Sequence, residues 1–167
     1  MVASRYSLGS AVLAVLVLAS VGAVTVASNP TLLPGGDDYN RTTVSLVSEG
    51  EVQTEVDVRV ADSYEKRYTG LSDTESLDAD EGMLFVHDET GEHAYVMREM
   101  AFPLDIVFVD ANGTITRIHH AELPPEGASG DDLTRYRGTG KYVLEVPYGY
   151  TNETCIEEGD TVRIDGY

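Results

Sequence analysis

Hydrophobic and polar residues alternate with a period of two between Val52 and Val60. Every even-numbered position there is valine or threonine, and every position between them is polar or charged. This period is typical of a β-strand with one buried face and one solvent-exposed face. Residues 42–47 have the same β-branched character, and the turn-forming residues 48–51 lie between the two segments. The pattern therefore predicts a β-hairpin over residues 42–60.

Three further apolar runs lie in the middle of the chain, at residues 83–86, 94–97 and 104–109. The sequence DETGE separates the first two runs, and DANG follows the third. Both clusters have the composition of turns. We expect the first two runs to form an antiparallel hairpin in which His87 lies opposite His93.

The remaining pattern predicts one short helix and three more strands. Asp62 and Glu65 have the spacing of a capping box, and Gly70 can end a helix over residues 63–69. Strands are predicted at residues 114–119, 141–146 and 161–165, with a long loop at 121–140. Short strands separated by turns predict an all-β fold, mainly an antiparallel β-sandwich or barrel, with one helix.

The N-terminal segment differs in composition from the rest of the chain. Residues 8–27 are an uncharged run of about 20 small and apolar residues, long enough to cross a bilayer as a helix. Arg5 precedes this run, so the N-terminus is expected in the cytoplasm and the domain outside the cell. We interpret residues 1–27 as a signal anchor, or alternatively as a cleaved signal peptide of a secreted protein. Residues 28–41 are interpreted as a flexible linker to a β domain at 42–167.

The charge of the chain limits its possible partners, and its cysteine content limits its possible disulfide bonds. The chain has 29 acidic and 11 basic residues, a formal net charge of −18 at pH 7. This charge disfavours nucleic acid as a partner, and its even spread favours adaptation to high salt over a sink for multivalent cations. The single cysteine, Cys155, excludes an internal disulfide. Glycosylation sequons at Asn40, Asn112 and Asn152 fit an exported surface.

Five short motifs in a fixed order resemble domain-of-unknown-function family 192 (DUF192). The motifs are Arg67 with Gly70-Leu71, GMLF at 82–85, YVMR at 95–98, PLDI at 103–106 with Phe108, and KYVLEV at 141–146. The resemblance covers residues 52–166. It implies a compact β-sandwich that is often exported, and it implies no activity.

The predicted hairpin places two imidazoles and two thioethers on one face. Register would set Phe85 opposite Tyr95 and Met83 opposite Met97, and such ligands suit copper. The two pairs lie four residues apart, about 13 Å along a strand, too far for one ion. We therefore favour an apolar core with a histidine pair at its rim.

Asp105 interrupts a strand that is otherwise apolar on both faces. A carboxylate in this position needs a partner or a raised pKa, and Arg67 and Arg98 are the candidate partners. One hypothesis is a ligand pocket formed by Asp105 and an arginine. The other is a structural ion pair, or a carboxylate bound by backbone N–H groups. His119, His120 and Glu122 are weaker metal candidates, because adjacent strand residues face opposite sides.

The function predicted from these residues is a non-catalytic ligand-binding module at the cell envelope. Its ligand-binding candidates are Arg67, Met83, Met97, Arg98 and Asp105. The alternatives are a hydrolase that uses Asp105 as acid or base, and a structural or interaction protein of the envelope. We assign no catalytic residue, metal ligand or cofactor. The expected partner is a small ligand or an envelope component, with the membrane contacted through the N-terminal segment.

Overall fold

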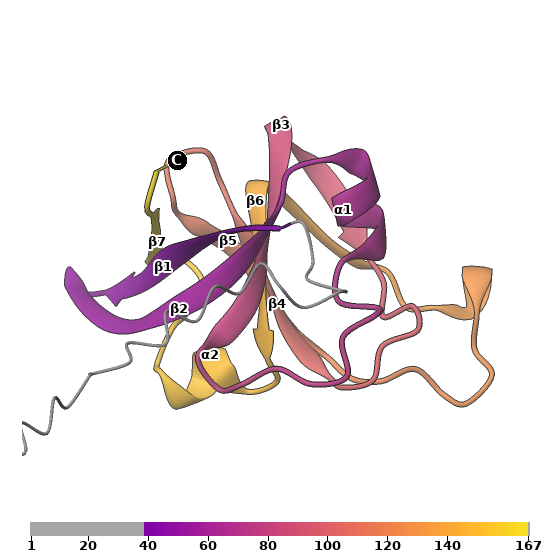
Figure 1. The fold of residues 1–167 in the computed structure, drawn as a ribbon. Helices are drawn as coiled ribbons and strands as arrows, with labels where there is room; N and C mark the ends of the chain where they lie inside the picture. The colour runs from indigo at the N-terminus through magenta and orange to yellow at the C-terminus, as the bar shows by residue number, and fades with distance from the viewer. Residues whose placement is uncertain (1–38, 167) are drawn as a thin grey trace, which may run out of the picture. The chain divides into compact units, whose positions relative to one another are not determined.

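The computed structural model describes residues 39–166, which fold as one curled seven-stranded sheet with short helices packed beside it (Figure 1). The strand order in the sheet is β5-β4-β6-β3-β2-β1-β7. The predicted N-terminal helix at 1–27 lies outside the described residues, as does all but the end of the predicted linker. The elements are β1 (Asn40–Ser48), β2 (Glu51–Ala61), α1 (Tyr64–Thr69), β3 (Glu81–Tyr95), β4 (Leu104–Val109), β5 (Ile115–Ala121), η2 (Gly130–Asp132), β6 (Tyr136–Pro147), α2 (Tyr150–Glu153) and β7 (Thr161–Ile164).

The first predicted hairpin is confirmed. β1 and β2 pair antiparallel, with Val44 opposite Val56 and Ser48 opposite Glu51. Glu49 and Gly50, the two residues of the turn, both have positive φ angles. Two positive φ angles are what the common two-residue hairpin turn requires, because that turn matches the twist of the flanking strands.

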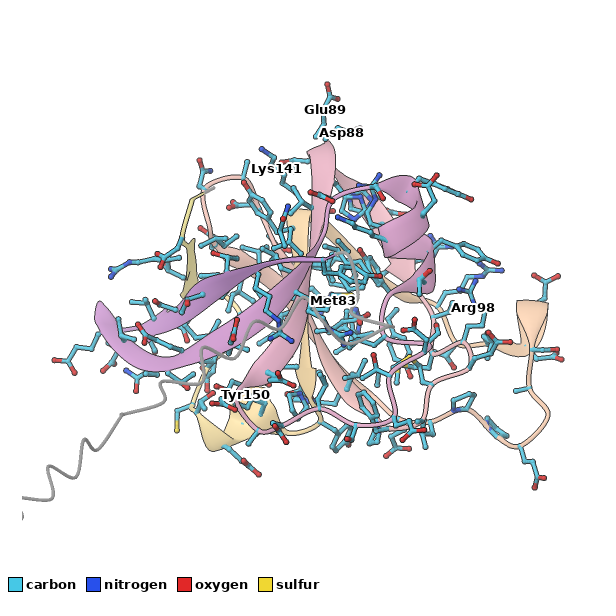
Figure 2. All side chains as sticks on the ribbon, in the orientation of Figure 1. Met83, Asp88, Glu89, Arg98, Lys141 and Tyr150 are labelled. Atoms are coloured by element: carbon cyan, nitrogen blue, oxygen red, sulfur yellow. The ribbon has the colours of Figure 1, made fainter. Side chains whose placement is uncertain are left out.

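The central hairpin predicted around DETGE is wrong. The apolar runs at 83–86 and 94–97 do not pair with each other, because the first run and the start of the second belong to one strand, β3, whose two halves both pair with β6. Residues 87–90 form a bulge between these halves, opposite the single residue Lys141. Figure 2 shows the bulge residues Asp88 and Glu89 projecting from the tip of β3. The two histidines that flank the turn sequence still meet across the bulge.

The sheet is mixed, because β2 and β3 pair in parallel, with Val58 opposite Gly82. A parallel pair needs a crossover connection, which residues 62–80 with helix α1 supply. The predicted short helix is confirmed, but its N-cap is Ser63 and not Asp62. The Ser63 hydroxyl accepts from the Lys66 backbone N–H at 3.3 Å, whereas the Asp62 carboxylate pairs with the Lys66 ammonium.

The sheet curls on itself, and neither a two-sheet sandwich nor a fully closed barrel forms. Its two edge strands meet only near one corner, where an isolated bridge joins Thr114 to Thr161. The inner face carries a core that contains Val56, Leu84 and Leu144. The outer face carries a second core, under α1 and the neighbouring loops, that contains Phe85, Phe108, Met83, Met97 and Leu71. The central strands are therefore covered on both faces.

Gly138 allows the close approach of Phe108 to β6. A Cβ atom at Gly138 would lie within 2.7 Å of three atoms of the Phe108 ring, which is fully buried. Gly138→Ala is therefore expected to displace this ring and to lower the free energy of unfolding by roughly 1–3 kcal/mol. Urea denaturation measures this loss. Gly91→Ala is the control, because a Cβ there meets only ordinary contacts with His93 at 3.8 Å; equal losses in both variants would contradict the packing argument.

No helix within residues 39–166 combines the length and apolar character needed to cross a membrane.

Candidate functional site

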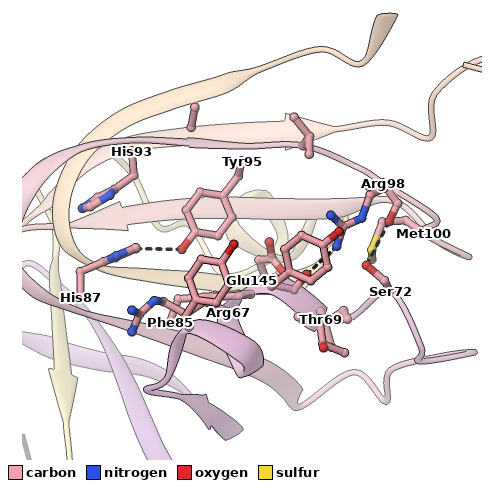
Figure 3. A pocket seen from close by; sticks show the side chains of 16 residues that line it. Arg67, Thr69, Ser72, Phe85, His87, His93, Tyr95, Arg98, Met100 and Glu145 are labelled. Carbon is pink, nitrogen blue, oxygen red and sulfur yellow. Dashed lines mark hydrogen bonds between the residues drawn. The ribbon is translucent and has the colours of Figure 1, made fainter. Parts of the chain in front are cut away.

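A pocket of about 340 Å³ opens between α1, the second half of β3 and the outer face of β6 (Figure 3). This volume is at the lower end of the range for small-molecule sites. Helix α1 contributes Tyr64, Arg67 and Tyr68, whose spacing of three and four residues places them on one helix face. The other lining residues are Thr69, Gly70, Leu71, Ser72, Phe85, His87, His93, Ala94, Tyr95, Val96, Arg98, Met100 and Glu145.

Glu145 lies in the pocket lining, on β6, between β4 and β3 in the sheet (Figure 3). Its neighbours in the sheet are Met83 on β3 and Ile106 on β4, both fully buried. The residue is only 7% exposed, and its carboxyl makes no hydrogen bond or ion pair within residues 39–166. Burial raises the pKa of Glu145 from its usual 4.5 to about 8. The carboxyl is therefore largely protonated at neutral pH.

Tyr95 and two histidines form a hydrogen-bonded group beside Glu145. The His87 Nε2 atom and the Tyr95 hydroxyl are 3.0 Å apart, and the rings of His87 and His93 stack with centroids 3.6 Å apart. The His93 Nε2 atom lies 3.1 Å from the Gly140 carbonyl oxygen. Burial, followed by His93, lowers the pKa of His87 to about 4. Burial and the nearby Glu145 raise the pKa of Tyr95 well above its usual 10. At neutral pH both His87 and Tyr95 are uncharged.

Two arginines face the pocket, Arg67 from α1 and Arg98 from the loop after β3 (Figure 3). The Arg67 Nη1 atom donates to the carbonyl oxygens of Val86 at 2.8 Å and of Asp62 at 3.1 Å. The Arg98 Nη2 atom donates to the Tyr68 carbonyl oxygen, and the Arg98 guanidinium stacks on the Tyr68 ring at 4.0 Å. Among the described residues, neither arginine has a carboxylate partner.

The structure separates the predicted ligand-binding candidates. Arg67 and Arg98 line the pocket, whereas Met83 and Met97 lie buried in the outer core. The predicted contacts between His87 and His93 and between Phe85 and Tyr95 are present, with the second pair of rings edge to face at 5.0 Å. They arise from the bulge in β3, not from the expected hairpin register.

Asp105 does not line the pocket, and neither Arg67 nor Arg98 is its partner. It is fully buried, and its carboxylate accepts from Gly149 N at 3.0 Å, Thr151 N at 2.9 Å and Thr151 Oγ1 at 2.7 Å. The Nδ1 atom of His120 lies 2.6 Å from Asp105 Oδ1. These hydrogen bonds connect the start of α2 to β4. Because this carboxylate is fully buried and already bonded, the structure gives the hydrolase hypothesis based on Asp105 no support.

The histidines at 119 and 120 point to different partners. His119 Nε2 lies 2.8 Å from the Arg137 carbonyl oxygen, and His120 contacts Asp105. Within the described part of the chain, no group of three His, Cys, Asp or Glu side chains is arranged to hold a metal ion.

Sequence reasoning missed Glu145, although the signal that singled out Asp105 applies equally to it. Both are lone carboxylates inside an apolar strand, at 104–109 and 141–146 respectively. The sequence pattern does not show which of the two has partners. Only the tertiary structure places N–H groups around Asp105 and an open pocket over Glu145.

Comparison with known proteins gives a family and a fold. The DUF192 family model, described as "Uncharacterized ACR", matches residues 44–164. A crystal structure of a candidate transcription regulator from Sinorhizobium meliloti is 28% identical, with a TM-score of 0.68 over 77% of this chain and 97% of that one. A protein of unknown function from Novosphingobium aromaticivorans is 22% identical, with a TM-score of 0.63 over 77% of this chain and 89% of that one. No curated protein matches the chain.

Proposed function

The chain belongs to the DUF192 family, and from this premise we propose that its β domain is a non-catalytic binding module for a small organic ligand. The observation that carries the proposal is Glu145, a buried carboxyl with no partner among residues 39–166, beneath a pocket of about 340 Å³. The Glu145 carboxyl is accessible from the pocket, because among the described residues no fully buried side-chain nitrogen or oxygen lacks a hydrogen-bond partner. A ligand in the pocket can therefore bond to it.

The groups around Glu145 favour binding over catalysis. The imidazole of His87 bonds to Tyr95, whose raised pKa makes its hydroxyl a poor nucleophile. The hydroxyl of Ser72 donates to the Arg98 carbonyl oxygen and not to an imidazole. Among the described lining residues, no serine or threonine is therefore paired with a base, as nucleophilic catalysis requires.

A second candidate function is acid–base catalysis by Glu145. A carboxyl with a pKa of about 8 is protonated at neutral pH and can act as a general acid. This candidate replaces the alternative built on Asp105. It requires turnover of a bound ligand that is lost in Glu145→Gln, whereas a binding module releases its ligand unchanged.

We also propose that the domain works at the cell envelope. The support is in the sequence alone: the apolar residues 8–27 after Arg5, and sequons at Asn40, Asn112 and Asn152. A role in DNA binding is disfavoured for this chain, because 29 acidic residues against 11 basic ones repel the phosphate backbone.

The test is ligand-induced stabilisation of the full chain. Thermal unfolding is measured against a broad panel of small metabolites that carry hydroxyl, amine, carboxylate and phosphate groups, because a ligand that binds only the folded state raises its melting temperature. We expect at least one compound to raise the melting temperature of the wild type and to lose this effect in Glu145→Gln.

Glu51→Gln is the matched control, because it removes one carboxylate from an exposed position on β2. Its ligand-induced shifts should equal those of the wild type. The proposal fails if no compound stabilises the chain, or if every shift survives in Glu145→Gln.

A further inference from the structure

We propose that the ligand is an organic carboxylate with a flat apolar face, which lies on the exposed tyrosines of α1 while its carboxylate binds Arg98 and Arg67. This inference rests on the proposed function and names the class of its ligand. Three observations carry it. Arg67 and Arg98 have no carboxylate partner among the described residues, two stacked tyrosine rings are exposed beside them, and Glu145 lies in the same pocket.

Two arginines without a carboxylate partner lie together in the pocket; Lys141 and Arg163, elsewhere among the described residues, also pair with no carboxylate. Five basic side chains outside the pocket lining contact a carboxylate within 3.5 Å: Arg41, Lys66, Arg117, Arg135 and Arg137. Arg67 and Arg98 instead donate only to backbone carbonyl oxygens, although acidic residues outnumber basic ones by 29 to 11. Each guanidinium has N–H groups to spare, in the fork geometry that matches a carboxylate.

Two tyrosines on α1 form an exposed aromatic ledge at the mouth of the pocket. Tyr64 and Tyr68 are 73% and 61% exposed, their rings lie 22° from parallel, and their centroids are 6.3 Å apart. The Arg98 guanidinium covers Tyr68 at 4.0 Å, so a positive charge adjoins the ledge. Tyr68 is already covered by Arg98, so the open ring surface is mainly that of Tyr64. It is suited to stack on a flat apolar surface, which aromatic acids and the acids of pyranose sugars both present.

Glu145 offers a polar contact in the same pocket. This contact does not repel an anionic ligand. Its carboxyl is in the neutral form at neutral pH, because the buried site raises its pKa to about 8. The neutral group can donate a hydrogen bond to a carboxylate or exchange one with a ligand hydroxyl. The pocket thus presents two cations and no anion to a ligand at this pH, in a protein whose net charge is strongly negative.

The size of the pocket and its cations distinguish this ligand from a protein partner. A volume of about 340 Å³ suits one ring with its substituents. A protein that contacted only Tyr64 and Tyr68 would not place a carboxylate of its own beside Arg67 and Arg98.

The experiment is calorimetric titration of the full chain at pH 7 and fixed ionic strength. The probes are benzoate and glucuronate, their uncharged counterparts benzamide and glucose, and inorganic phosphate. We expect one or both carboxylates to bind at least tenfold more tightly than the uncharged counterpart and more tightly than phosphate. The stronger of the two identifies the ring as aromatic or sugar.

Four single variants locate the interaction. Arg98→Gln is expected to weaken carboxylate binding about tenfold or more, and Arg67→Gln provides a second test of the same charge. Arg135→Gln, which removes an equal charge from an exposed pair with Asp131, should bind as the wild type does. Tyr64→Leu should weaken binding a few-fold, since stacking is lost while the contact between Arg98 and Tyr68 is kept.

The possible outcomes distinguish a failure of the carboxylate inference from a failure of the proposed binding function. Uncharged probes that bind as tightly as the acids, or affinity that survives both Arg98→Gln and Arg67→Gln, would overturn the carboxylate inference. Binding that still depends on Glu145 would then leave the binding module standing. If no probe binds, the carboxylate class is rejected, and the broad metabolite panel decides the binding function independently.

Discussion

Replacing Asp105 with alanine is expected to lower the free energy of unfolding by about 3–5 kcal/mol. The change leaves four donors without their acceptor: Gly149 N, Thr151 N, Thr151 Oγ1 and His120 Nδ1. Three of them belong to the start of α2 and the residue before it, so this segment also loses its attachment to β4. The two Thr151 donors are buried together with Asp105, so water does not readily replace their bonds.

Urea denaturation of the variant and the wild type at pH 7 measures this effect. Asp105→Asn should cost less than alanine, because the amide oxygen still accepts from one side of the network. Asp131→Ala serves as the control, since it breaks only an exposed ion pair with Arg135 and should leave stability unchanged. A loss below about 1 kcal/mol in Asp105→Ala would contradict the anchoring role.

Replacing Glu145 with glutamine is expected to stabilise the protein at pH 8.5 and to change its stability little at pH 5. The carboxyl has a pKa of about 8 in the folded chain and an ordinary value of 4.5 when burial is removed. Between these values the folded state holds a proton that the unfolded state has released. Stability therefore falls as pH rises from about 4.5 to about 8, the reverse of the usual behaviour of a carboxylate.

The size of this effect follows from the displacement of the pKa. A change from 4.5 to about 8 corresponds to a loss on the order of 4 kcal/mol across this pH range. Glutamine has no such proton, so the difference between variant and wild type isolates the contribution of Glu145 from that of the other acidic residues. Loss of the ligand-induced shift together with a gain in stability is typical of a binding residue maintained at a cost to folding.

Urea denaturation of both proteins at pH 5 and pH 8.5, in the same salt, measures this difference. Glu51→Gln corrects for the removal of one negative charge from a very acidic surface. Equal stability differences at the two pH values would show that the carboxyl is not held in an environment that raises its pKa.

The local elements of the fold could be predicted where the signal lay within a few neighbouring residues. The alternation of residues 52–60, the turn at Glu49 and Gly50, and the short helix that ends before Gly70 all follow from backbone preferences and period. The pairing of β3 could not be predicted in the same way. A DETGE turn and a DETGE bulge share one composition, and only the long partner strand β6 decides between them.

The candidate site was likewise predictable only in part: the sequence identified unusual residues, but not which of them contact one another. The sequence identified Asp105 as an anomalous carboxylate in need of a partner, with Arg67 and Arg98 as the candidate partners. It could not pair them, because their separation along the chain does not determine which side chains meet. The distant segment at 149–151 supplies donors to Asp105, which leaves both arginines without a carboxylate.

What the sequence determined by itself is a β-rich domain of the DUF192 type, with a strongly acidic surface and strands apolar on both faces. These properties depend on composition and on short-range periodicity, which survive without knowledge of the fold. The tertiary structure alone decided that the sheet is mixed and curled, that Asp105 is structural, and that Glu145 lies beneath a pocket. Each of these depends on which distant segments come together, and burial and hydrogen bonding are set by that packing rather than by neighbours in sequence.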